Sequence, residues 1–172
     1  MSLSLYEATV PLLLGTLAKL DALLDKAAAS EISDSEIVEA RLTPDMLPFS
    51  KQIQITSDTA KGAVARLTGV ENPAMADTET TLAELKDRIA KTVAFIEGVD
   101  KAAFDGADDR DVGVKLPSFD LHWVGRDYLR QYVLPNFYFH TSIAYALLRQ
   151  KGVQIGKSDF LPVDPSAVRP KS

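Results

Sequence analysis

The chain contains no cysteine among its 172 residues and only two histidines. Without cysteine there are no disulfides, no thiolate catalysis, no iron–sulfur cluster and no cysteine-ligated zinc site. No apolar run approaches the ~20 residues that a membrane-spanning helix needs, and the apolar segment after Glu7 has neither a basic region before it nor a clear cleavage site after it. We therefore expect a cytoplasmic protein with no membrane partner.

The chain also lacks a surplus of positive charge, because 19 Lys and Arg residues stand against 24 Asp and Glu residues, a net charge of −5. Phosphate backbones are bound by clustered Lys and Arg, so we expect no nucleic acid partner. The sequence has no phosphate-binding glycine loop, nucleophile elbow or zinc-protease motif. Its length and its hydrophobic fraction of 46% indicate one globular domain with a continuous core.

Apolar residues at spacings of three and four predict four long helices. The first has a capping box in Ser4 and Glu7, and Pro11 predicts a kink or a late start. The second is predicted to begin at Thr43 and Pro44, a cap followed by a proline suited to the first helical position. The apolar residues that share one face of the first predicted helix are Tyr6, Val10, Leu13, Leu14, Leu17, Leu20 and Leu24. Those of the second, its apolar stripe, are Phe49, Ile53, Ala60, Val64 and Leu67.

The third helix is predicted to follow the capping box of Thr81 and Glu84, and one short helix is expected within residues 30–40. The last helix is predicted to begin near residues 125–127, to bend at Pro135 and to end where Lys151 gives way to glycine. Its many aromatic residues are typical of a core or a subunit contact.

Between the third and last helices apolar residues recur at every second position. Val112, Val114 and Leu116 alternate with polar residues, and so do Phe119, Leu121 and Trp123 after a Pro-Ser turn. This pattern predicts a short β-hairpin whose apolar side lies on the bundle. The expected fold is therefore an all-α four-helix bundle over residues 1–161, with a hairpin before the last helix and a disordered tail over residues 162–172.

The two histidines differ in their surroundings. His122 alternates with Leu121 and Trp123, so it is predicted to face solvent. His140 lies in an aromatic helix segment, with Asn136 one turn earlier on the same face. An imidazole there can be a core residue bonded to a polar neighbour, a proton acceptor or a metal ligand, and the sequence leaves these alternatives open.

A polar line runs beside the apolar stripe of the second helix. Gln52, Thr56 and Thr59 follow one another at spacings of four and three, so they share a face. Asp58 and Lys61 lie beside them and read as a solvated flank, whereas Thr59 is small enough to face inward at a helix interface.

Four separate segments carry a family resemblance: ARLTPDM at residues 40–46, AKGAVARL at 60–67, LPNFYFH at 134–140 and GKSDFL at 156–161. The chain resembles, from about residue 3 to 161, an uncharacterised bacterial domain-of-unknown-function family within the DinB/YfiT-like superfamily of proposed metalloenzymes. The resemblance implies a DinB-like four-helix bundle that often forms a homodimer. It supplies no known reaction.

The resemblance also implies a position for a metal. In metal-binding members three histidines hold a divalent ion, one from the second helix and two, four residues apart, from the last. Here His140 matches one of them, whereas the other positions fall on Asn136 and at or near Thr59. A chain with two histidines and no cysteine cannot build a three-histidine site within one subunit, so we expect no metal cofactor, with zinc or nickel as the alternative.

Our leading hypothesis is a non-metal small-molecule-binding or regulatory module with a pocket near His140, Asn136, Thr59, Asp58 and Thr56. The alternative is a metal-dependent transferase or hydrolase of the superfamily that acts on a small substrate. A third possibility is a structural or partner-binding protein in which His140 is fully packed. The sequence does not decide whether the chain is an enzyme.

Overall fold

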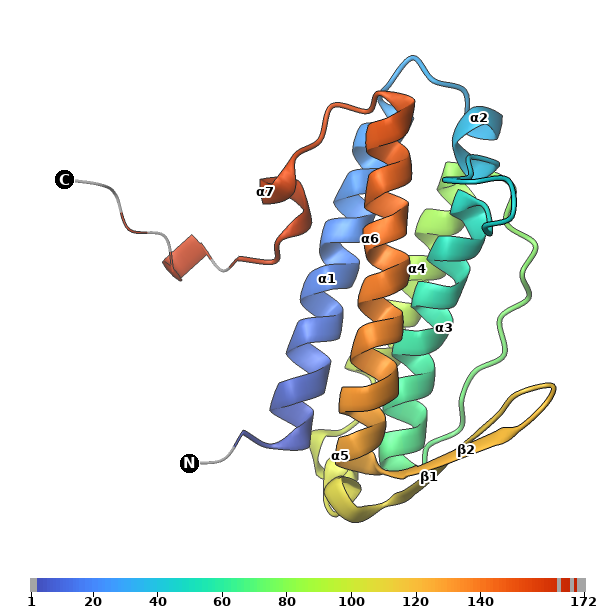
Figure 1. The fold of residues 1–172 in the computed structure, drawn as a ribbon. Coiled ribbons are helices and arrows are strands. Elements are labelled where there is room, and N and C mark those ends of the chain that lie inside the picture. The colour runs from blue at the N-terminus through green and yellow to red at the C-terminus, as the bar shows by residue number, and fades with distance from the viewer. Residues whose placement is uncertain (1–2, 164, 168, 170–172) are drawn as a thin grey trace.

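The computed structural model describes residues 3–163, 165–167 and 169. In this part of the chain four long helices lie side by side, α1 (Leu5–Ala28), α3 (Phe49–Thr68), α4 (Leu82–Glu97) and α6 (Leu134–Lys151) (Figure 1). Helix α3 packs against both α4 and α6, and α1 packs against α4. The predicted four-helix bundle with a small hairpin before its last helices is confirmed.

The capping boxes place several helix starts where the sequence predicts them. Ser4 caps α1 and Thr81 caps α4, each with the glutamate three residues later bonding back to the cap. A third box, on Ser33, starts the short α2 (Asp34–Val38), which confirms the short helix expected there. The late start expected at Pro11 is wrong, because α1 begins at Leu5 and Pro11 lies inside it on an exposed face.

The predicted start of the second long helix at Thr43 and Pro44 is also wrong. Helix α3 begins at Phe49, with Pro48 as its N-cap residue, and the Thr43 hydroxyl instead donates to Asp45 over 2.6 Å. The physical reason is Pro48, which the sequence interpretation overlooked. A proline disfavours helical geometry at the residue before it and has no N–H for an interior turn, so a helix from residue 44 cannot continue through it.

The last helix keeps right-handed helical dihedral angles where its segments join but is irregular in its hydrogen bonds. It begins as α5 (Gly125–Tyr128), widens into a π-turn, η3 (Leu129–Val133), and continues as α6. Pro135 lies in the first turn of α6 and has no N–H to donate to the preceding turn, which explains why the wider turn comes directly before it. Gly152, with a φ of 98°, ends α6 in the left-handed conformation.

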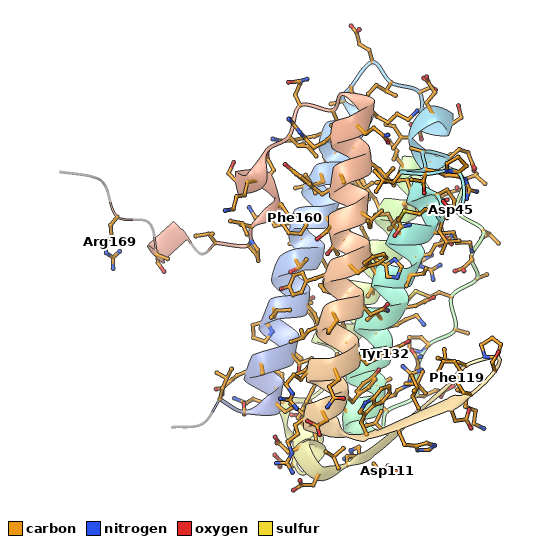
Figure 2. All side chains as sticks on the ribbon, in the orientation of Figure 1. Asp45, Asp111, Phe119, Tyr132, Phe160 and Arg169 are labelled. Carbon is orange, nitrogen blue, oxygen red and sulfur yellow. The ribbon has the colours of Figure 1, made fainter. Side chains whose placement is uncertain are left out.

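The hairpin consists of β1 (Asp111–Lys115) and β2 (Asp120–Val124), paired antiparallel with Val114 opposite Leu121. It follows two 3₁₀ turns, η1 (Lys101–Phe104) and η2 (Ala107–Asp109). Val114 is buried and His122 is exposed, as the alternation predicts. The outer end of the hairpin projects from the bundle and carries Phe119 (Figure 2), which is 57% exposed.

After α6 the chain turns back onto α1. Helix α7 (Lys157–Phe160) is held there by a 2.7 Å ion pair between Lys26 and Asp159. A 3₁₀ turn, η4 (Pro165–Ala167), follows. The disorder predicted for residues 162–172 falls in part on residues 164, 168 and 170–172, which lie outside the described residues. None of the described helices has the length and hydropathy needed to cross a bilayer.

Candidate functional site

His140 is paired with the polar line of α3. It is 9% exposed, and its Nδ1 lies 2.8 Å from Gln52 Oε1. The Gln52 amide nitrogen donates to the Leu47 carbonyl over 2.9 Å, which turns the amide oxygen toward the imidazole. Nδ1 therefore carries the proton, and the lone pair of the neutral ring is on Nε2.

Burial lowers the pKa of His140 below its usual value, and this shift makes stability depend on pH. The unfolded chain takes up this proton at higher pH than the folded protein does. The free energy of unfolding should therefore fall as pH drops below the ordinary histidine pKa of about 6.5, with a slope of up to about 1.4 kcal/mol per pH unit from this group. We expect His140→Gln to show a shallower loss in urea unfolding between pH 7.5 and 5.5.

The exposed His122 supplies the matched control, because His122→Gln removes the same kind of group from the hairpin surface. Its pH profile should follow that of the wild-type protein. Equal profiles for His140→Gln and the wild type would show that His140 does not titrate differently on folding.

Asn136 and Thr59 form a second pair across the same interface. The Asn136 amide donates to the Thr59 hydroxyl over 2.8 Å. Thr56 lies between the two pairs, is fully buried, and turns its hydroxyl to the Gln52 carbonyl of its own helix. The structure thus brings the predicted residues of α3 and α6 together along one seam.

A cavity of about 180 Å³ opens beside the second pair, about six times the ~30 Å³ that a water molecule occupies in the liquid. Hairpin residue Val114 is part of its wall. Three predicted site residues border the cavity, whereas His140 and Thr56 do not. The full lining is Ile55, Asp58, Thr59, Arg66, Val114, Tyr128, Tyr132 and Asn136.

Arg66 and the tyrosines Tyr128 and Tyr132 are site residues that the sequence interpretation missed, because the tyrosines read as core. The Arg66 guanidinium donates to the Tyr128 hydroxyl over 3.3 Å. Burial raises the pKa of Tyr128, so its hydroxyl stays protonated.

Among the described residues Arg66 has no carboxylate within ion-pair distance. Gly62 makes room for it, since a Cβ there would collide with the guanidinium.

Asp58 is partly exposed, as its flank position suggested, but its carboxylate is paired with two cations. Its carboxylate accepts from Arg88 over 2.9 Å and pairs with Lys61 at 3.1 Å. Arg88 is 2% exposed and was also missed. The signal available in the sequence was its spacing, because Arg88 falls three residues after Leu85 and four before Thr92, both of which are buried.

The sequence model of a family described as "Domain of unknown function (DUF1993)" matches residues 5–161. The chain belongs to this family. It is also similar to a solved structure described as a DinB family member protein from Shewanella denitrificans, with 36% sequence identity, 96% of each chain covered and a TM-score of 0.85. No curated protein gives a match.

The DinB-like family raises the question of whether these residues suit a metal. Within the described part of the chain no three His, Cys, Asp or Glu side chains gather closely enough to hold an ion. At the positions that match the superfamily's ligands, Asn136 and Thr59 are neutral and bond to each other, and His140 directs Nδ1 at Gln52. A neutral amide and a hydroxyl are poor donors for zinc or nickel, so this set does not fit such a metal.

Proposed function

We propose that this DinB-like bundle is a metal-independent binding module whose ligand is a small carboxylate. The observation that carries the proposal is the half-buried Arg66 guanidinium, which borders a cavity open to solvent on one side and has no carboxylate partner among the described residues. A guanidinium presents two parallel N–H groups that match the two oxygens of a carboxylate. The Tyr128 hydroxyl and the Asn136–Thr59 pair add hydrogen-bonding groups to the same wall.

The negative charge of Asp58 in this wall does not oppose the assignment strongly, because Arg88 and Lys61 both pair with it. The cavity volume limits the ligand to a few non-hydrogen atoms. Such ligands gain at most about 1.5 kcal/mol per atom, so a probe of five such atoms, such as propionate, gains at most about 7.5 kcal/mol and binds no more tightly than the micromolar range. The homodimer implied by the family resemblance stays a prediction.

The Arg66 assignment predicts which probes bind. In an NMR titration propionate should shift residues around Thr59 and Asn136 saturably, whereas the neutral isostere propionamide should bind at least about tenfold more weakly. Arg66→Gln should weaken propionate binding by about tenfold. Gly62→Ala should also weaken it, because the new Cβ displaces the guanidinium without deleting it.

Arg130→Gln is the matched control, since this arginine is exposed and pairs with Asp127 outside the cavity. It should leave propionate binding unchanged. Equal binding of propionate and propionamide, or shifts with inorganic phosphate but not with propionate, would contradict the carboxylate assignment. The alternative of a metal-dependent transferase or hydrolase has no comparable support, because the donor set at His140 does not fit a metal.

A further inference from the structure

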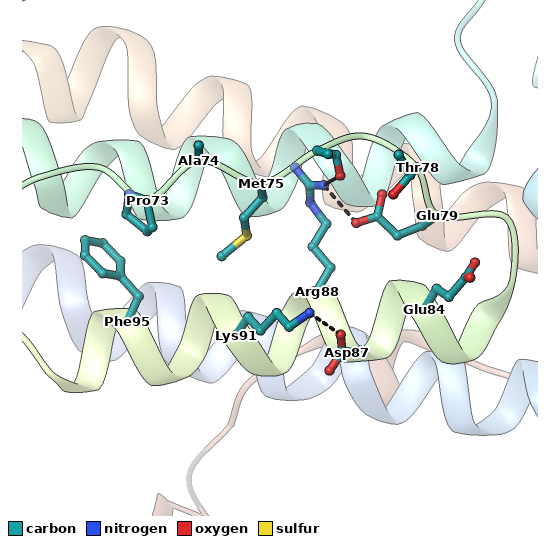
Figure 3. A pocket seen from close by; sticks show the side chains of 11 residues that line it. Pro73, Ala74, Met75, Thr78, Glu79, Glu84, Asp87, Arg88, Lys91 and Phe95 are labelled. Carbon is teal, nitrogen blue, oxygen red and sulfur yellow. Dashed lines mark hydrogen bonds and ion pairs between the residues drawn. The ribbon is translucent and has the colours of Figure 1, made fainter.

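A larger cavity lies between α4 and the linker that joins α3 to α4 (Figure 3). Its volume is about 660 Å³, within the ~300–1,000 Å³ usual for small-molecule sites. One wall is a single face of α4, and the other is the linker. The lining is Pro73, Ala74, Met75, Ala76, Thr78, Glu79, Glu84, Asp87, Arg88, Lys91 and Phe95.

The linker wall is held in place although residues 69–81 form neither helix nor strand. Arg88 crosses from α4 and donates to the Ala76 carbonyl over 3.1 Å and to Glu79 over 2.9 Å. From α3, Gln54 donates to Glu79 and Lys51 donates to Asp77. Side-chain contacts from both α3 and α4 therefore fix the linker wall of the cavity.

The two ends of the cavity differ in chemistry. Phe95, Pro73 and Met75 lie together at one end, and all three are half-buried (Figure 3). Asp87 and Lys91 lie along α4 beyond them, exposed and joined as an i,i+4 ion pair. Phe95 and Asp87 stand eight residues apart, ~12 Å along the axis of α4, and their side chains shorten the span that a ligand must bridge. A ligand that contacts both needs an apolar group at one end and a polar group at the other.

The charge of the lining favours a cationic polar group. Three carboxylates line the cavity against two cations, a net charge of −1. The terminal nitrogens of Arg88 are already occupied by Glu79, Asp77 and Asp58. Its Nε has no hydrogen-bond partner among the described residues but is buried, so Arg88 offers little to an anion. The Asp87–Lys91 pair is exposed and contributes little to stability, so Lys91 can leave Asp87 to solvent at small cost.

We propose that this cavity binds a primary amine that carries an aromatic or branched apolar group. The apolar group packs between Phe95 and Met75, and the ammonium donates to Asp87 in place of Lys91. The proposal does not depend on the Arg66 cavity, because Arg66 does not line this space.

Three probes of one length test the charge preference by NMR titration. The amine 4-phenylbutylamine should bind saturably and shift residues between Pro73 and Phe95. The alcohol 4-phenylbutanol should bind more weakly, and the acid 4-phenylbutyrate should bind most weakly.

Asp87→Asn should weaken binding of the amine by about fivefold and leave binding of the alcohol unchanged. Lys91→Gln should tighten amine binding, because it removes the competitor for Asp87. Phe95→Leu should weaken amine and alcohol alike.

Asp109→Asn controls for the loss of one negative charge, since Asp109 is exposed and lies outside the cavity. It should leave all three probes unchanged, and so should Arg66→Gln. Equal affinity for the amine and the acid, absence of saturable amine binding, or shifts confined to the Arg66 cavity would each overturn the proposal. Asp87, Lys91 and Asp109 are exposed, so these variants test it without disturbing the core.

Discussion

Replacing Arg88 by methionine should lower the free energy of unfolding by about 3 kcal/mol, measured by urea denaturation at pH 7. Its side chain is 1% exposed, and it is the shared partner of Asp58, Asp77 and Glu79. Removing one member of a buried ion pair typically costs ~3–5 kcal/mol, because the other charges stay behind unpaired. Asp58 and Asp77 are about 40% exposed and are solvated by water, so the lower end applies.

Methionine keeps most of the volume of Arg88, so the loss reports the charges rather than a void. Burial by itself would raise the pKa of Glu79, but its hydrogen bond from Arg88 leads the interactions that bring that pKa below the usual value. Glu79→Gln in the Arg88→Met background should therefore recover part of the loss. Lys91→Met is the control on the same helix, and it should cost less than about 0.5 kcal/mol. Equal losses for Arg88→Met and Lys91→Met would contradict this account.

Gly125→Ala should be about as damaging, with an expected loss of about 3 kcal/mol in the same measurement. Gly125 begins α5 at the point where the hairpin joins the last helix. A Cβ there would collide with the backbone carbonyl of Ala107 and lie 3.0 Å from a methyl group of Leu67. Backbone in η2 cannot rotate away as a side chain can, so the last helix or the turn must shift.

Gly156→Ala is the matched control, because a Cβ at Gly156 meets nothing nearer than Asp159 at 4.0 Å. It should change stability by less than about 0.5 kcal/mol. If Gly125→Ala unfolds at the same urea concentration as the wild type, the close approach of α5 to η2 does not limit this junction.

Much of the candidate site followed from spacing along single helices. Gln52, Thr56 and Thr59 share one face of α3, and Asn136 and His140 share one face of α6, as the i,i+4 rule predicts. The ion pair of Asp58 with Arg88 could not be predicted from the spacing of residues within α3. Arg88 comes from another helix, 30 residues later.

Local patterns in the sequence determined the helices, their capping boxes and the hairpin with its exposed His122, because each depends on residues a few positions apart. The composition, with two histidines and no cysteine, excluded a three-histidine metal site within one subunit. Only the tertiary structure decided that Asn136 bonds Thr59 across 77 positions and that His140 bonds Gln52 across 88. It also decided that Arg88 is buried, that one cavity borders α3 and that a second lies between α4 and the linker before it. Such pairs form when helices pack, and packing depends on the shapes of all the side chains at an interface rather than on spacing within one segment.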